Sequence, residues 1–117
     1  MILVIGPCAS GKRTYVRSLG YGDEDMAPAQ LDQRPVVYDL QDLVSRTLEE
    51  GKGIETLVEP LLDKEVVICN EVGSGVIPAD GALTRAREQT GRICILLAQQ
   101  AQRVVRMVCG IPTELKG

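Results

Sequence analysis

The chain has 117 residues, of which 44% are hydrophobic and 25% charged, and its formal net charge is −3. This length allows one compact domain with a hydrophobic core, and the composition is that of a globular chain rather than a disordered one. The acidic balance argues against nucleic acid as a partner, because nucleic-acid-binding proteins usually have a basic surface. No apolar run reaches the roughly 18 residues of a membrane span, and no signal-like segment opens the chain. We therefore expect a cytoplasmic protein with no membrane partner.

Four short runs rich in valine, leucine and isoleucine predict strands, at residues 1–5, 36–40, 65–69 and 103–109. These runs are mostly continuous rather than alternating, which is typical of parallel strands covered on both faces. Helical spacing predicts helices between them, the first from residue 11 and the others over residues 41–50, 54–62 and 80–101. Strands that alternate with helices predict an α/β fold with right-handed crossovers and a mainly parallel sheet of about four to five strands.

Two segments show no clear element. Residues 20–35 contain too few apolar side chains for a helix or a strand, so they predict a surface loop. Residues 110–117 are typical of a turn followed by a short tail. Arg106 interrupts the apolar run of the last predicted strand, which indicates either an edge strand or a face turned toward water or a partner.

The chain contains four cysteines and no histidine, and the cysteines are too widely spaced to suggest a zinc site. Cys69, Cys94 and Cys109 follow or lie within apolar runs, so we expect them to be buried free thiols. Cys8 lies in a glycine-rich turn before a predicted helix, where the pKa of a thiol can be lowered. A reactive Cys8 is therefore an open alternative to a structural one.

The segment GPCASGK, residues 6–12, has the G-x-x-x-x-G-K spacing of a phosphate-binding loop, and it lies between a predicted strand and a predicted helix. Its glycines allow close backbone approach, its amide groups and the helix N-terminus favour an anion, and Lys12 reaches the β- and γ-phosphates. A purely structural glycine turn is the alternative. The pattern predicts that a nucleoside triphosphate, ATP or GTP, is bound by Gly6, Pro7, Cys8, Ala9, Ser10, Gly11, Lys12, Arg13 and Thr14.

Arg13 departs from the usual pattern, because the residue after the loop lysine normally supplies a hydroxyl to Mg²⁺. A guanidinium group cannot ligate a cation. Thr14 carries a hydroxyl, but one helix position rotates it by about 100°, so it is not an automatic substitute. We expect the loop to bind polyphosphate, with Arg13 adding a bidentate contact, and we expect its magnesium chemistry to be impaired.

Polar residues follow two of the predicted strands at the edge where ligands bind in open α/β sheets. Asp39 ends one strand and is predicted to hold Mg²⁺ directly or through water; capping of the next helix is the alternative. Asn70 and Glu71 follow another strand, and Glu71 is predicted to be a catalytic base or a metal ligand, with a solvated turn residue as the alternative. We expect these residues to converge with the phosphate loop.

A set of motifs extends beyond the loop: NEVGSGVIP at residues 70–78, then Arg87, Gly91 and Arg92 in a predicted helix, then GIP at residues 110–112 and LK at residues 115–116. Together with the phosphate loop, they resemble the adenosylcobinamide kinase/adenosylcobinamide-phosphate guanylyltransferase family, over residues 1–20 and about 35–117. The resemblance implies a P-loop NTPase-like three-layer fold, a single nucleotide-binding domain over residues 1–117, and a homo-oligomer, usually a trimer.

The resemblance also implies an activity. Members of the family use a nucleoside triphosphate to phosphorylate the hydroxyl of adenosylcobinamide in cobalamin biosynthesis, and then transfer GMP through a guanylylated histidine. Catalytic roles for Lys12 and Glu71 and a phosphate contact from Arg92 follow as expectations.

Three departures change this expectation. The chain has no histidine for a guanylyl intermediate, Arg13 replaces the magnesium-binding hydroxyl, and GRICI at residues 91–95 replaces the family's Gly-Arg-Leu-Asn-Gln. Two hypotheses remain open: a kinase without guanylyltransferase activity, and a catalytically inactive nucleotide- or phosphate-binding module with a regulatory or scaffolding role. A kinase for an unrelated metabolite fits the loop but not the motif at residues 70–78.

Overall fold

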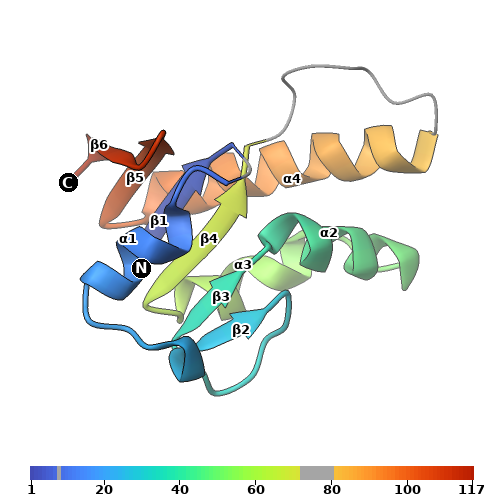
Figure 1. Ribbon diagram of the computed structural model, residues 1–117. Helices are drawn as coiled ribbons and strands as arrows, with labels where there is room; N and C mark the ends of the chain where they lie inside the picture. Colours follow the sequence, from blue (N-terminus) through green and yellow to red (C-terminus); the bar gives the residue numbers. More distant parts are fainter. Residues whose placement is uncertain (8, 72–80) are drawn as a thin grey trace.

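The computed structural model describes residues 1–7, 9–71 and 81–117, and within these ranges six strands form one sheet in the order β2-β3-β4-β1-β5-β6 (Figure 1). The strands are β1 (Ile2–Gly6), β2 (Met26–Pro28), β3 (Val36–Tyr38), β4 (Val66–Asn70), β5 (Arg103–Val108) and β6 (Ile111–Lys116). The helices are α1 (Lys12–Ser18), α2 (Leu40–Glu49), α3 (Glu55–Leu62) and α4 (Gly81–Gln100), with a short 3₁₀ helix, η1 (Asp23–Asp25).

The first five strands are parallel and β6 is antiparallel to β5, so the predicted α/β fold with a mainly parallel sheet is confirmed. Central strand β1 pairs with β4 on one side and with β5 on the other. Because side chains alternate along a strand, Leu3 and Val4 face opposite sides of the sheet, and both are buried. This two-sided burial explains why the strand reads as a continuous apolar run.

The two faces of the sheet are covered unequally, which gives three layers (Figure 1). Val16 of α1 packs against one face, in a cluster with Val4 and Ile68. Helices α2, α3 and α4 cover the other face through a larger cluster of buried residues. Among the described residues, no helix is long and apolar enough to cross a membrane.

The prediction of a plain surface loop over residues 20–35 is wrong, because this segment contains η1 and β2. Strand β2 has three residues and pairs in parallel with β3, which buries Met26 and Ala27. Pro28 is exposed at this edge of the sheet, where a residue without an N–H group is tolerated. The strand is too short for its pattern to be recognised in the sequence.

The prediction of a tail at the C-terminus is also wrong, because β6 forms a hairpin with β5. The turn residues Cys109 and Gly110 have φ angles of 50° and 76°, the left-handed values that a tight hairpin turn requires. Cys109 is therefore exposed rather than buried. Since β6 lies outside β5, Arg106 is not on an edge strand; its side chain is exposed, as the second alternative expected.

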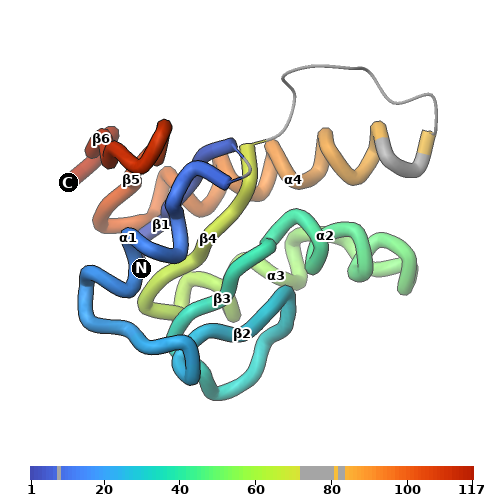
Figure 2. The backbone as a smooth tube through the Cα atoms, viewed as in Figure 1, coloured from blue at the N-terminus to red at the C-terminus, as the bar shows by residue number. Residues whose placement is uncertain are grey.

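Figure 2 traces the path of the chain and shows the carboxyl ends of β1, β3 and β4 at one end of the sheet, with the C-terminus at the β6 edge. The phosphate loop follows β1, Asp39 follows β3, and Asn70 ends β4. These three sequence positions, far apart in the chain, are thereby brought together.

Candidate nucleotide-binding site

The phosphate loop turns sharply between β1 and α1. Ala9 and Gly11 have φ angles of 57° and 89°, which lie in the left-handed region. A side chain at Gly11 would be strained by this conformation, and its Cβ would lie 3.3 Å from the Cα of Gly110. Glycine is therefore required at residue 11 for both backbone conformation and space.

Gly6 is required for a different reason, because its Cα lies against neighbouring backbone. A Cβ there would lie 2.5 Å from the carbonyl oxygen of Met107 and 2.7 Å from the Ser10 hydroxyl. The Gly6 carbonyl accepts a hydrogen bond from the Glu71 N–H (2.8 Å), and the Gly110 N–H donates to the Ser10 carbonyl (3.0 Å). The loop is thus fixed between the end of β4 and the β5–β6 turn.

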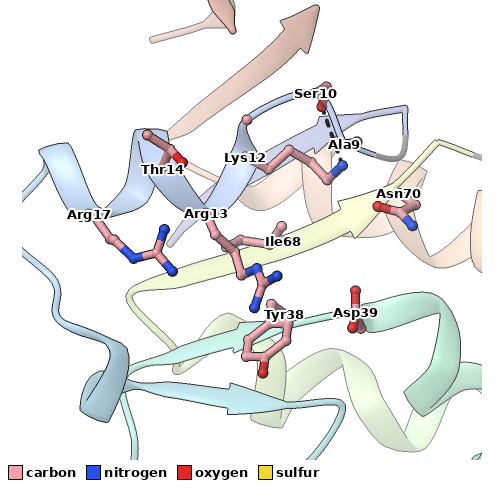
Figure 3. Close-up of a pocket in the computed structure, with 11 residues that line it drawn as sticks. Ala9, Ser10, Lys12, Arg13, Thr14, Arg17, Tyr38, Asp39, Ile68 and Asn70 are labelled. Atoms are coloured by element: carbon pink, nitrogen blue, oxygen red, sulfur yellow. Dashed lines mark hydrogen bonds between the residues drawn. The ribbon is translucent and has the colours of Figure 1, made fainter. Parts of the chain in front are cut away.

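Lys12 opens α1 and is buried, with 8% of its surface exposed. Its ammonium group turns back over the loop and donates hydrogen bonds to the Pro7 carbonyl (2.6 Å) and the Ser10 hydroxyl (3.3 Å) (Figure 3). An ammonium group can donate three hydrogen bonds, so a phosphate oxygen that approaches the loop meets a cation already in place.

A cavity of about 280 Å³, here called the loop cavity, opens beside the loop (Figure 3). Its walls come from the loop, α1 and the carboxyl ends of β3 and β4. The described residues that line it are Ala9, Ser10, Gly11, Lys12, Arg13, Thr14, Arg17, Tyr38, Asp39, Ile68 and Asn70. Among these, three are cationic (Lys12, Arg13 and Arg17) and one is anionic (Asp39), so the walls favour an anionic ligand.

Arg13 extends from α1 across the loop cavity toward β3. Its guanidinium carbon lies 4.8 Å from the centre of the Tyr38 ring, a cation–π contact (Figure 3). Within the described part of the chain, no carboxylate forms an ion pair with Arg13. Arg17 follows one turn later and pairs with the exposed Asp23 at 2.7 Å.

Asp39 occupies the N-cap position of α2 in a left-handed conformation, with φ 56° and ψ 47°. Asp39 therefore has the position of a helix cap, as the alternative expected, but its side chain makes no capping hydrogen bond. The Asp39 carboxylate instead accepts a hydrogen bond from the Gln41 side-chain amide (3.3 Å), and the side-chain oxygen Oε1 of Gln41 accepts one from the Asn70 N–H (3.1 Å). Gln41 thus ties the ends of β3 and β4 together.

Glu71 does not line the loop cavity. It forms a bidentate ion pair with Arg106, with Nε–Oε1 at 2.5 Å and Nη2–Oε2 at 3.1 Å. These two residues stand on opposite sides of β1, at the end of β4 and on β5. The pair raises the pKa of Arg106, chiefly through the hydrogen bonds from its guanidinium to the Glu71 carboxylate. A role for Glu71 as base or metal ligand would require this pair to open.

The loop cavity does not fit the Mg²⁺ ion that phosphate loops normally bind. A guanidinium group stands where the ligating hydroxyl is needed, and Thr14 lies on a different side of α1 from Arg13 (Figure 3). Asp39 is the one carboxylate among the described lining residues. The described part of the chain contains no group of three or more acidic or cysteine side chains placed to hold a metal ion.

Other predicted site residues fall elsewhere. Arg92 is exposed on α4, which covers the face of the sheet opposite α1. Cys8 and residues 72–78 of the NEVGSGVIP motif lie outside the described residues. Sequence reasoning missed Tyr38, Arg17 and Gln41. The spacing of four between Arg13 and Arg17 was a usable signal for the second arginine, because residues four apart share one side of a helix.

A phosphate loop after the first strand of a three-layer, mainly parallel sheet defines the class as an α/β protein with a P-loop-like fold. A family model described as cobinamide kinase / cobinamide phosphate guanyltransferase matches residues 37–115, which is more than half of the chain. The chain belongs to this family, so the resemblance seen in the sequence is confirmed. Membership connects the chain to the kinase and guanyltransferase type of function in cobalamin biosynthesis.

The matched residues begin within β3 and end in β6, so the match does not include the phosphate loop at residues 6–12. The interpretation of the loop therefore depends on its own sequence and geometry. No curated protein matches the chain.

Proposed function

We propose that the chain binds a nucleoside triphosphate, ATP or GTP, at the phosphate loop, and acts as a kinase of the adenosylcobinamide type without guanylyltransferase activity. The observation that carries this proposal is Lys12, which is buried and held over the concave side of the loop. Gly6, Pro7, Cys8, Ala9, Ser10 and Gly11 would surround the β- and γ-phosphates, with Thr14 near the phosphate closest to the nucleoside.

Phosphoryl transfer depends on positioning and charge stabilisation more than on covalent chemistry. Lys12 would stabilise charge on the transferred phosphoryl group, and the hydroxyl of adenosylcobinamide would be the acceptor. Asp39 is the one carboxylate among the described residues that line the loop cavity, so it would orient that acceptor. The 117 residues contain no histidine, so a guanylylated histidine cannot form within them.

The second candidate function is a catalytically inactive nucleotide- or phosphate-binding module with a regulatory or scaffolding role. It is favoured by the pairing of Glu71 with Arg106, which engages the carboxylate predicted as a catalytic base. The two candidates share the triphosphate site and differ only in chemistry.

The test begins with calorimetric titration of ATP and of GTP into the protein and into a Lys12→Ala variant. Loss of the lysine should weaken triphosphate binding by at least about a hundredfold, because a buried charge-assisted contact is removed. Lys52→Gln is a matched control, since Lys52 is exposed and pairs with Glu50 far from the loop cavity. Equal affinity in the wild-type and Lys12→Ala proteins would contradict the proposal.

Transfer of labelled γ-phosphate to adenosylcobinamide then separates the two candidates. Labelled product that disappears in Lys12→Ala identifies the kinase, whereas binding without product identifies the inactive module. Glu71→Gln should abolish transfer if Glu71 acts as a base. Unchanged transfer in this variant would remove Glu71 from the mechanism.

The arrangement of the chain in solution is a separate part of the proposal. We propose that residues 1–117 form a single domain and that the protein is cytoplasmic and assembles as a homo-oligomer, a trimer by analogy with the family. Light scattering coupled to size-exclusion chromatography tests the assembly. A monomer at all concentrations would contradict it.

A further inference from the structure

We infer that the loop cavity binds its triphosphate without a divalent metal ion, with Arg13 supplying positive charge that Mg²⁺ supplies at other phosphate loops. This inference rests on the proposed triphosphate site and specifies the chemical form of its ligand. The ligand is a metal-free nucleoside triphosphate or another linear polyphosphate.

The first support is the position of Arg13. It follows Lys12 directly, so it stands where the metal-binding hydroxyl would be. Although Arg13 is exposed, its guanidinium reaches across the loop cavity to the ring of Tyr38, 4.8 Å away (Figure 3). A divalent cation held by Asp39 in the same cavity would face the positive charge of Arg13, and the two would repel each other.

The second support is the way Arg13 is held. The guanidinium carbon of Arg13 lies 4.8 Å from the centre of the Tyr38 ring, a cation–π contact, and the guanidinium carries several N–H donors. No carboxylate among the described residues pairs with those N–H groups. They are therefore available for two parallel hydrogen bonds to phosphate oxygens, the geometry in which arginine binds phosphate most strongly.

The third support is the charge of the cavity walls. Its described lining residues include three cations and one carboxylate. A free triphosphate carries more negative charge than its magnesium complex, so walls with an excess of positive charge favour the free form. Arg17 is shared with Asp23, but that pair is exposed and can exchange for a phosphate contact at little cost in stability.

The test is a titration of ATP, and of inorganic tripolyphosphate, into the wild-type protein with EDTA and with excess Mg²⁺. We expect affinity in EDTA to equal or exceed affinity in Mg²⁺ for both ligands. Arg13→Ala should weaken binding in EDTA by about tenfold, the loss of one charge-assisted contact. Arg13→Ser, which restores the hydroxyl, should make binding depend on Mg²⁺. Lys52→Gln should match the wild-type protein in every condition.

The outcomes separate this inference from the proposed function. Wild-type binding that strengthens many-fold with Mg²⁺ would overturn the inference and leave the triphosphate site standing. No binding of either ligand in either condition would overturn both. Circular dichroism on each variant shows that it is folded, and Arg13→Lys gives a second reading, because it keeps the charge and loses the bidentate geometry. Equal affinity of Arg13→Ala and wild type in EDTA would also overturn the inference.

Discussion

Two groups of charged residues stand at the same end of the sheet, and they are organised in opposite ways. At the loop cavity, Lys12 donates hydrogen bonds to loop acceptors, and Arg13 contacts an aromatic ring without a carboxylate partner among the described residues. Across β1, Glu71 at the end of β4 and Arg106 on β5 neutralise each other in a bidentate pair. In the first arrangement the guanidinium of Arg13 can bind an anionic ligand, whereas in the second both charges are neutralised within the protein.

A charged residue at the ligand-binding edge of a sheet is therefore not sufficient to indicate a site. Glu71 follows β4 just as Asp39 follows β3, and both were predicted to serve the ligand. Only Asp39 lines the loop cavity. Glu71 is instead paired with Arg106 of β5, which occupies its carboxylate.

The largest effect on stability is expected from a substitution at Gly6, which lies between the loop cavity and the Glu71–Arg106 pair. The Gly6 carbonyl accepts a hydrogen bond from the Glu71 N–H, and the Cα of Gly6 lies against the backbone of Met107. The Cβ of Gly6→Ala would lie 2.5 Å from the Met107 carbonyl oxygen. We expect the free energy of unfolding to fall by about 1–3 kcal/mol, the range for overpacking. Urea unfolding measures it.

Gly81→Ala is the matched control, because a Cβ at Gly81 meets nothing within 4 Å. Its unfolding midpoint should stay close to that of the wild-type protein. A Gly6→Ala variant as stable as this control would show that the loop can shift away from β5.

A double-mutant cycle on Glu71 and Arg106 measures the strength of their ion pair. Glu71→Gln, Arg106→Gln and the double variant should give a coupling energy of about 1 kcal/mol, because the pair is bidentate but partly exposed. Triphosphate affinity should be the same in all three. A loss of affinity in Glu71→Gln alone would assign Glu71 to the ligand instead of to Arg106.

Substitutions at Tyr38 should have a smaller effect, on triphosphate affinity at the loop cavity. Tyr38→Leu removes the ring under Arg13, and we expect triphosphate affinity to fall by about 0.5–1 kcal/mol, the strength of an exposed cation–π contact. Tyr38→Phe keeps a ring and should bind as the wild-type protein does. If both variants lose affinity equally, the Tyr38 hydroxyl rather than the ring is responsible.

The buried strands and the phosphate loop could be predicted from the sequence, because continuous apolar runs and glycine spacing are local signals. Strand β6 could not, since all its side chains are exposed and no alternation marks it. The Glu71–Arg106 pair joins residues 35 positions apart across β1, and the cation–π contact between Arg13 and Tyr38 joins α1 to β3. Such contacts arise only from the order of the strands, which sequence pattern did not specify.

The smallest expected effect concerns the two thiols on the α4 side of the sheet. The neighbouring Cys69 thiol lowers the pKa of Cys94, while the pKa of Cys69 itself is raised. In Cys69→Ala this partner is lost, so the pKa of Cys94 should rise. Its reaction with iodoacetamide, followed by mass spectrometry of its peptide, should then need higher pH. Cys109, in the exposed hairpin turn, is the internal control. An unchanged pH profile for Cys94 would show that Cys69 does not lower its pKa.

The most direct test of the central claim is a crystal structure of the protein grown with a non-hydrolysable ATP analogue and Mg²⁺. We expect the phosphates to contact Lys12 and both edge N–H groups of Arg13, with no metal ion between them and Asp39. A magnesium ion bound to the phosphates and held by Thr14 or Asp39, with Arg13 displaced to solvent, would contradict the claim.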